Sequence, residues 1–189
     1  MALSDGTEKF THERNLMTTA ELLLQDYDHE IAGARRVLER VPEKPEYTCH
    51  EKSMPLGKLA MHVATLPSFG KTILTTPGMD MANPDHKFPE LTWQGREAAL
   101  AAFDANAAAT RAALASLSDA QLAEPWTFAF GEHVIGKAPR SLSYRQYFFN
   151  HFLHHRAQLS VYLRLNDIPV PGLYGPSADE PFNPVAKPA

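Results

Sequence analysis

The sequence contains a single cysteine, Cys49, in 189 residues. An internal disulfide and a zinc site built from several cysteines are therefore both excluded. An excess of basic residues is also lacking, because 18 Lys and Arg stand against 22 Asp and Glu, for a formal net charge of -4. Since nucleic-acid binding depends on neutralising phosphates, this balance argues against a nucleic-acid partner. No apolar run approaches the roughly 18 to 20 residues of a membrane span, so we expect no membrane partner.

The length and the hydrophobic content fit a single globular domain. Of the 189 residues, 44% are hydrophobic and 21% are charged, a balance typical of one folded unit with its own core. Residues 1–16 carry charges throughout and lack the apolar run of a secretory signal. We therefore expect a cytoplasmic protein with a polar extension over residues 1–16, one domain over 17–180 and a tail over 181–189.

Four segments have apolar residues at the alternating three- and four-residue spacing of an amphipathic helix. They lie at about residues 19–41, 54–75, 94–117 and 142–165. The first begins with a capping-box pattern, in which Thr18 is followed three residues later by Glu21, and it ends before Pro42. Four helices of this length can each bury one apolar stripe in a common core.

A short β-hairpin is predicted between the third and fourth helices. Alternating aromatic residues from Trp126 to Phe130 are typical of a strand, and a turn at Gly131–Glu132 leads to a second strand over 133–135. The segment 77–91 is rich in Pro, Asp and Asn, which favours a surface connection. The sequence therefore predicts an all-α fold, a four-helix bundle with a small β-hairpin.

Three of the nine histidines lie where a metal site could form. His151 and His155 are four residues apart, which places both imidazoles on one face of a helix and lets them reach one ion. His62 falls between Leu59 and Leu66 on the core-facing side of the second helix. Three nitrogen ligands leave positions open for water or substrate, as in catalytic zinc sites. The alternative is that these histidines pack in the core or face a dimer partner.

Other catalytic templates are absent. The sequence has no nucleophile elbow, no phosphate-binding glycine loop and no H-E-x-x-H protease motif. Tyr27, Glu30 and Gln158 are candidates to line a pocket near the histidines, with Glu30 as a base or as a group that supports the metal ligands.

Three stretches of sequence resemble a known family, the DinB/YfiT-like proteins, which are assigned as metal-dependent. They are TAELLLQDYDHEIAGARRVLERVP, KSMPLGKLAMHVATLP and NHFLHHRAQLSVYLRLNDIPVPGLYGPSADE. The resemblance implies a metal site made of His62, His151 and His155, the residues that the spacing also indicates. It further implies an up-down-down-up four-helix bundle and a homodimer. Some relatives are thiol-dependent transferases or isomerases, and others are assigned as hydrolases.

Three functional hypotheses follow. The first is an enzyme of the hydrolase or thiol-dependent transferase type, with one divalent ion, Zn or Ni, and a small-molecule substrate or a low-molecular-weight thiol. The second is a non-catalytic, dimeric, stress-related module that binds a metal or another ligand. The third is a bundle whose histidines pack without a metal. In either of the first two, the aromatic residues of the last helix would suit a dimer face: Tyr144, Tyr147, Phe148, Phe149 and Phe152.

Overall fold

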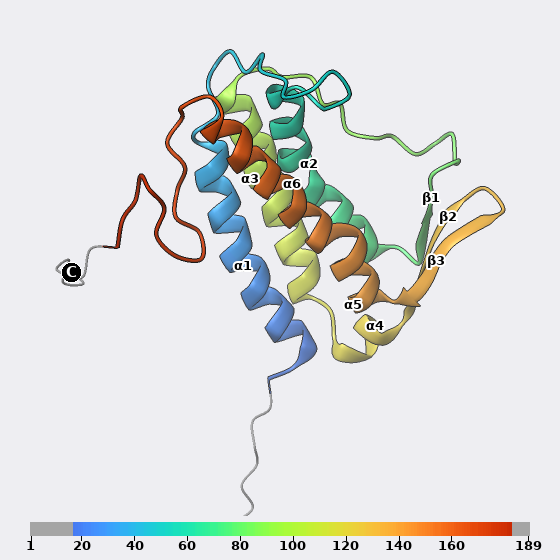
Figure 1. The fold of residues 1–189 in the computed structure, drawn as a ribbon. Helices are drawn as coiled ribbons and strands as arrows, with labels where there is room; N and C mark the ends of the chain where they lie inside the picture. The colour runs from blue at the N-terminus through green and yellow to red at the C-terminus, as the bar shows by residue number, and fades with distance from the viewer. Residues whose placement is uncertain (1–16, 183–189) are drawn as a thin grey trace, which may run out of the picture.

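Four long helices form the body of the structure, a computed structural model that describes residues 17–182 (Figure 1). They are α1 (Thr19–Leu38), α2 (Leu56–Thr75), α3 (Arg96–Ala115) and α6 (Asn150–Arg164). Both α3 and α6 contact α1 and α2, and in Figure 1 α1 and α6 rise while α2 and α3 descend. The fold is helix-rich, as predicted. The extension expected over residues 1–16 and the tail residues 183–189 lie outside the described residues.

The core lies where the apolar stripes of these helices meet. Tyr27, Leu59, Phe103 and Phe152 come from the four different helices, and each is at most 2% exposed. Burying a large apolar side chain in this way stabilises a fold by about 1.5–3 kcal/mol. Within residues 17–182, no helix combines the length and the hydropathy that a membrane span requires.

The start of α1 follows the capping box that the sequence predicts. The Thr18 hydroxyl accepts a hydrogen bond from the Glu21 amide at 3.1 Å, and the Glu21 carboxylate accepts one from the Thr18 amide at 2.8 Å. The helix ends at Leu38, three residues before the predicted end at Val41. The proline at 42 disfavours a helical conformation for the residue before it, which contributes to this early end.

The fourth predicted helix, over 142–165, is three elements rather than one. A short helix α5 (Arg140–Ser143) is followed by a π-helix η1 (Tyr144–Phe149) and then by α6. The expectation that the aromatic residues here form a dimer face is wrong for four of the five. Tyr144, Phe148, Phe149 and Phe152 are at most 3% exposed and pack within the chain. A wider helical turn changes which residues share a face, so the 3.6-residue period could not assign them.

The small sheet has three strands rather than the two of the predicted hairpin. The hairpin itself is confirmed as β2 (Pro125–Phe130) paired antiparallel with β3 (His133–Pro139). A third strand, β1 (Gly78–Asp80), pairs in parallel with β2 and comes from the segment predicted as a surface connection. Its approach depends on Gly78, where a Cβ would lie 2.6 Å from the Thr127 carbonyl oxygen. A strand of three residues is too short to leave a periodic signal. A five-residue helix, α4 (Asp119–Ala123), precedes β2.

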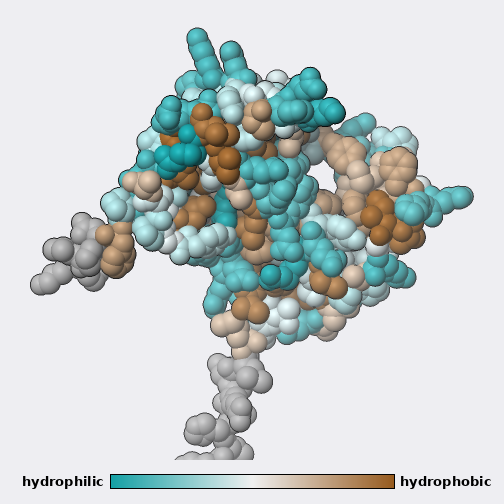
Figure 2. Space-filling model, viewed as in Figure 1, coloured by the Kyte–Doolittle hydropathy of each residue, from teal (hydrophilic) through white to brown (hydrophobic). Residues whose placement is uncertain are grey.

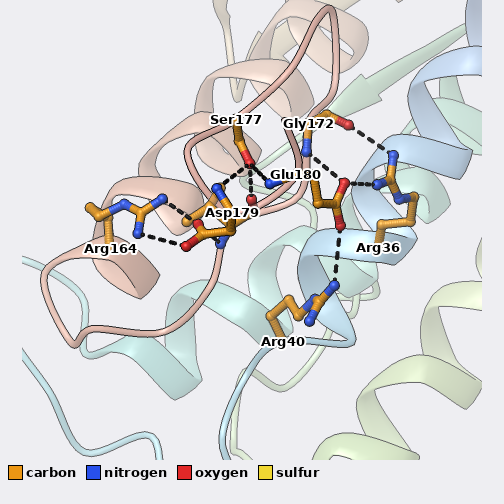
Figure 3. A network of polar contacts seen from close by, with 8 residues as sticks. Arg36, Arg40, Arg164, Gly172, Ser177, Asp179 and Glu180 are labelled. Carbon is orange, nitrogen blue, oxygen red and sulfur yellow. Dashed lines mark hydrogen bonds and ion pairs between the residues drawn. The ribbon is translucent and has the colours of Figure 1, made fainter. Parts of the chain in front are cut away.

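Two carboxylates hold the C-terminal segment, residues 169–180, against α1 and the end of α6 (Figure 3). Glu180 pairs with Arg36 and with Arg40 and accepts a hydrogen bond from the Gly172 amide at 3.0 Å. Asp179 pairs with Arg164 and accepts from the Val170 amide at 2.8 Å. This network explains why the sequence stretch that ends in SADE carries two adjacent acidic residues.

We expect both carboxylates to titrate in the acid range. The Arg164 guanidinium lowers the pKa of Asp179 below its ordinary 3.8, and the Gly172 amide lowers the pKa of Glu180 below its ordinary 4.5. Because both pKa values are lower in the folded chain than in the unfolded chain, the two ionised carboxylates stabilise the fold at any pH above their ordinary pKa values. This stabilisation is lost as the pH falls through the pKa values of the folded chain. Carboxyl-carbon NMR titration measures each midpoint. Arg164→Gln should raise the Asp179 midpoint and leave that of Glu180 in place, and the reverse pattern would contradict the assignment.

Candidate metal centre

Three histidine side chains from two helices converge beside the core. His62 is carried by α2, and His151 and His155 are carried by α6. Nε2 of His151 lies 2.8 Å from Nε2 of His155 and 3.4 Å from Nε2 of His62. The ligand atoms of all three lie within 4.8 Å of one another. An ion that binds each nitrogen at about 2.1 Å spans nitrogen pairs up to about 4.2 Å apart, a limit that includes both of these Nε2–Nε2 distances. The cluster could therefore hold a metal ion.

Local sequence explains why the rings meet. On α6 the four-residue spacing places His151 and His155 one turn apart, with ring centroids separated by 4.6 Å. On α2, His62 lies between the buried residues Met61 and Val63 and is itself half-buried. Because α2 and α6 pack against each other, the His62 ring reaches the pair, with its centroid 4.5 Å from that of His155.

The hydrogen bond of the outer ring nitrogen of His155 leaves its inner nitrogen as an acceptor. Gln158 Oε1 accepts a hydrogen bond from Nδ1 of His155 at 2.8 Å, which places the ring proton on Nδ1 and the lone pair on Nε2. This lone pair points into the cluster, where Nε2 of His151 lies 2.8 Å away, and it is available to a cation. The donor set therefore fits a divalent ion.

Burial keeps the three imidazoles uncharged at neutral pH. Removal from water, reinforced by the neighbouring His155 and His151, lowers the pKa of His62 from its ordinary 6.5 to about 4. Burial also lowers the pKa of His151 and that of His155 below 6.5. The neutral ring is the form that binds a metal, so no proton has to be displaced near pH 7.

A cavity of about 650 Å³ adjoins the cluster and is lined by two of its members, His62 and His151. One wall is the α2 face that carries Thr65, Leu66 and Phe69. The opposite wall comes from the segment after β1. Figure 2 shows the surface hollowed between the helices and this segment. The volume is within the range of roughly 300–1,000 Å³ for small-molecule sites.

The other candidate residues divide into one that is near the cluster and two that are not. Gln158 holds His155, as described above. The Tyr27 hydroxyl donates to the Ala107 carbonyl at 2.9 Å, and Glu30 pairs with Arg156. None of the three, Gln158 included, is among the described residues that line the cavity.

Sequence reasoning missed the outer wall of the cavity. Residues 77–91 were expected to be a surface connection, yet Met79, His86 and Phe88 line the cavity. The His86 ring lies 4.5 Å from the Phe88 ring, centroid to centroid. The available signal was the recurrence of large apolar residues among the prolines and acidic residues of this segment. The spacing of these apolar residues follows neither the helical nor the strand period, so the sequence could not show that this segment forms a wall of the cavity.

We expect Gln158 to affect metal affinity through the His155 ring. Gln158→Leu removes the acceptor of the Nδ1 proton, which frees the ring to change its tautomer and its orientation. Loss of such a supporting group typically weakens metal binding by about 10- to 100-fold. Competition for Zn²⁺ against a chromogenic chelator measures the effect. Gln25→Leu, the same substitution at an exposed position of α1, should leave the affinity unchanged. Equal affinities for the two variants would contradict the role of Gln158.

Comparison with known proteins identifies the family. The DinB superfamily model matches residues 23–159, so the chain belongs to this superfamily. A DinB-like protein from Bacillus cereus is 22% identical, with a TM-score of 0.59 over 84% of this chain and 99% of that chain. A DinB-like protein from Bacillus subtilis is 18% identical, with a TM-score of 0.58 over 78% and 96% of the two chains. At these identities the similarity shows a shared fold. A comparison with curated proteins found no match.

Proposed function

We propose that the chain is a metal-dependent enzyme of the hydrolase or thiol-dependent transferase type. In this proposal His62, His151 and His155 hold one divalent ion. The observation that carries it is the convergence of three imidazoles, two of which line a cavity large enough for a small molecule. Three protein ligands leave a coordination position for an exchangeable group, as in catalytic zinc sites.

The residues of the chain have distinct parts in this proposal. His62, His151 and His155 bind the ion, and Gln158 fixes the orientation of the His155 ring. When bound, a divalent ion lowers the pKa of a coordinated water or thiol and so supplies a nucleophile at neutral pH. The apolar cavity wall excludes water from the substrate. Zinc or nickel suits three imidazole ligands, and the choice between them depends on availability.

The proposed architecture is an up-down-down-up four-helix bundle that forms a homodimer in the cytoplasm. The directions of the four long helices in Figure 1 support the helix order. For the dimer, the β2–β3 hairpin offers exposed apolar side chains that a second copy could cover, since Phe130 and Val134 are each more than half exposed.

One observation favours the second candidate, a non-catalytic module that binds a metal or another ligand. Among the described residues that line the cavity there is no Asp or Glu. A hydrolase often uses such a carboxylate as its general base. A ligand-binding module has no need of one.

Metal content and turnover together test the proposal. Untagged protein should contain about one divalent ion per chain by mass spectrometry. The loaded protein should hydrolyse activated esters or transfer a thiol to an electrophile, and chelation should abolish this activity. Protein that stays metal-free after incubation with zinc and nickel would contradict the enzyme. Loaded protein with no turnover in either assay would favour the binding module.

A further inference from the structure

The cavity has an unusual charge balance for an acidic protein. The chain as a whole has a formal net charge of -4, yet no carboxylate lies among the described residues that line the cavity. Most of its wall is apolar or aromatic, with Leu66, Phe69 and Met79 as examples. A cation in this space would find no partner for its charge, and burying an unpaired charge is costly.

One of the lining residues, the exposed Lys87, carries a positive charge. Lys87 belongs to the segment after β1 and lines the cavity beside His86 and Phe88. In Figure 1 the first part of this segment stands out from α2 and α6, the helices that carry the histidine cluster, before the chain turns back to α3. The lining of the cavity therefore combines two histidines of the cluster, Lys87 on a different element, and apolar surface.

The aromatic part of the cavity wall suits an apolar body. Phe69 and Phe128 have ring centroids 6.0 Å apart, and Phe128 and Tyr147 have centroids 5.0 Å apart. These three rings line the cavity together. Aromatic walls of this kind bind apolar groups by burial and by ring contacts, and they offer few polar partners to a strongly hydrated molecule.

We infer that the cavity binds an amphiphilic anion, a small molecule with an apolar body and one negatively charged group that Lys87 recognises. This inference rests on the proposed function, because it names the class of molecule that the metal centre receives. Lys87 is a specificity-determining residue in this arrangement. It selects anions over neutral and cationic molecules of the same shape.

Displacement of a neutral apolar dye, N-phenyl-1-naphthylamine, tests this inference on the full chain. The competitors are octanoate, octan-1-ol and octylammonium, which share one chain length and differ in charge. Octanoate should bind about fivefold more tightly than octan-1-ol, the effect of roughly 1 kcal/mol for a partly solvated ion pair. Octylammonium should bind most weakly.

Two variants separate Lys87 from general charge effects. Lys87→Met should remove the preference for octanoate and leave the affinity for octan-1-ol unchanged. Lys71→Met changes an exposed lysine of α2 that does not line the cavity, and it should keep the preference. Equal binding of the three competitors by the wild type, or the same preference in both variants, would overturn the inference.

The metal centre must also be separated from Lys87, because a carboxylate can bind a metal directly. The assay is therefore repeated after chelation, and metal content is measured on each sample. A preference for octanoate that survives chelation and disappears in Lys87→Met supports the inference, whether or not the protein binds a metal. A preference lost on chelation and retained in Lys87→Met would assign the anion to the metal and overturn the role of Lys87. Failure to load a metal contradicts the proposed enzyme alone.

Discussion

Replacing His151 with alanine is expected to weaken Zn²⁺ binding by at least about a hundredfold, since even supporting residues around metal ligands typically contribute 10- to 100-fold. His151 is the central member of the cluster, with its Nε2 at 2.8 Å from that of His155 and 3.4 Å from that of His62. Its loss leaves two imidazoles from different helices, and two ligands hold a divalent ion poorly. Competition against a chromogenic chelator near pH 7 measures the dissociation constant directly.

The neighbouring His154 provides a matched control. It lies on the same helix, its ring centroid is 4.9 Å from that of His155, and its side chain is exposed. It is not a member of the three-histidine cluster in the described residues. His154→Ala therefore removes one imidazole from the same helix and should leave the affinity within about twofold of the wild type. Equal losses in the two variants would contradict the assignment, and circular dichroism shows whether each variant stays folded.

The histidine cluster could be predicted from sequence because its geometry is mostly local. Two of its members are separated by one helical turn, a distance that the helix itself fixes. The third, His62, could be placed only on the core-facing side of a second helix. That was enough, because two helices that pack through their apolar faces bring such residues together. Local sequence patterns also located the capping box at Thr18 and the hairpin that includes Trp126, because both features involve residues close together in the chain.

The cavity could not be predicted because its walls depend on contacts between distant segments. The pairing of β1 with β2 joins residues about fifty positions apart, such as Gly78 and Thr127. This pairing directs the following segment past α2, where Lys87 and Phe88 become cavity wall. The π-helix at Tyr144–Phe149 is similarly invisible to a pattern with a 3.6-residue period. Where the backbone departs from regular geometry, the faces assigned from the sequence are wrong.

Glu30 illustrates a residue whose position was predicted and whose role was not. Its place beside the apolar stripe of α1 indicated a carboxylate inside the protein, and the residue is 9% exposed. Its partner is Arg156 of α6, and the Tyr174 hydroxyl donates to the same carboxylate at 2.8 Å. Sequence alone offers no means of pairing residues 126 positions apart. The carboxylate therefore joins α1, α6 and the C-terminal segment, away from the cavity.

We expect Glu30→Gln to destabilise the fold by about 3 kcal/mol. The side chains of Arg156 and Glu30 are 3% and 11% exposed, so removing the negative charge leaves a buried guanidinium without its counter-ion. Breaking a buried ion pair from one side typically costs about 3–5 kcal/mol. Arg156 would keep its hydrogen bonds to the Glu30 carbonyl oxygen and the Tyr174 hydroxyl, but both partners are neutral, and its Nε atom has no hydrogen-bond partner among the described residues. Urea unfolding followed by circular dichroism measures the change in the free energy of unfolding.

A surface ion pair on the same helix is the control for this prediction. Asp28 pairs with Arg111 through two hydrogen bonds of 2.7 Å, but both side chains are more than 40% exposed. Asp28→Asn should therefore cost less than about 1 kcal/mol.

The double variant Glu30→Met, Arg156→Met removes both charges and should be more stable than Glu30→Met alone, because no unpaired charge remains in the core. If Glu30→Gln cost no more than Asp28→Asn, or the double variant were the least stable, the cost would not come from an unpaired buried charge. The pair would then have no special part in holding α6, and with it the histidine cluster, against α1.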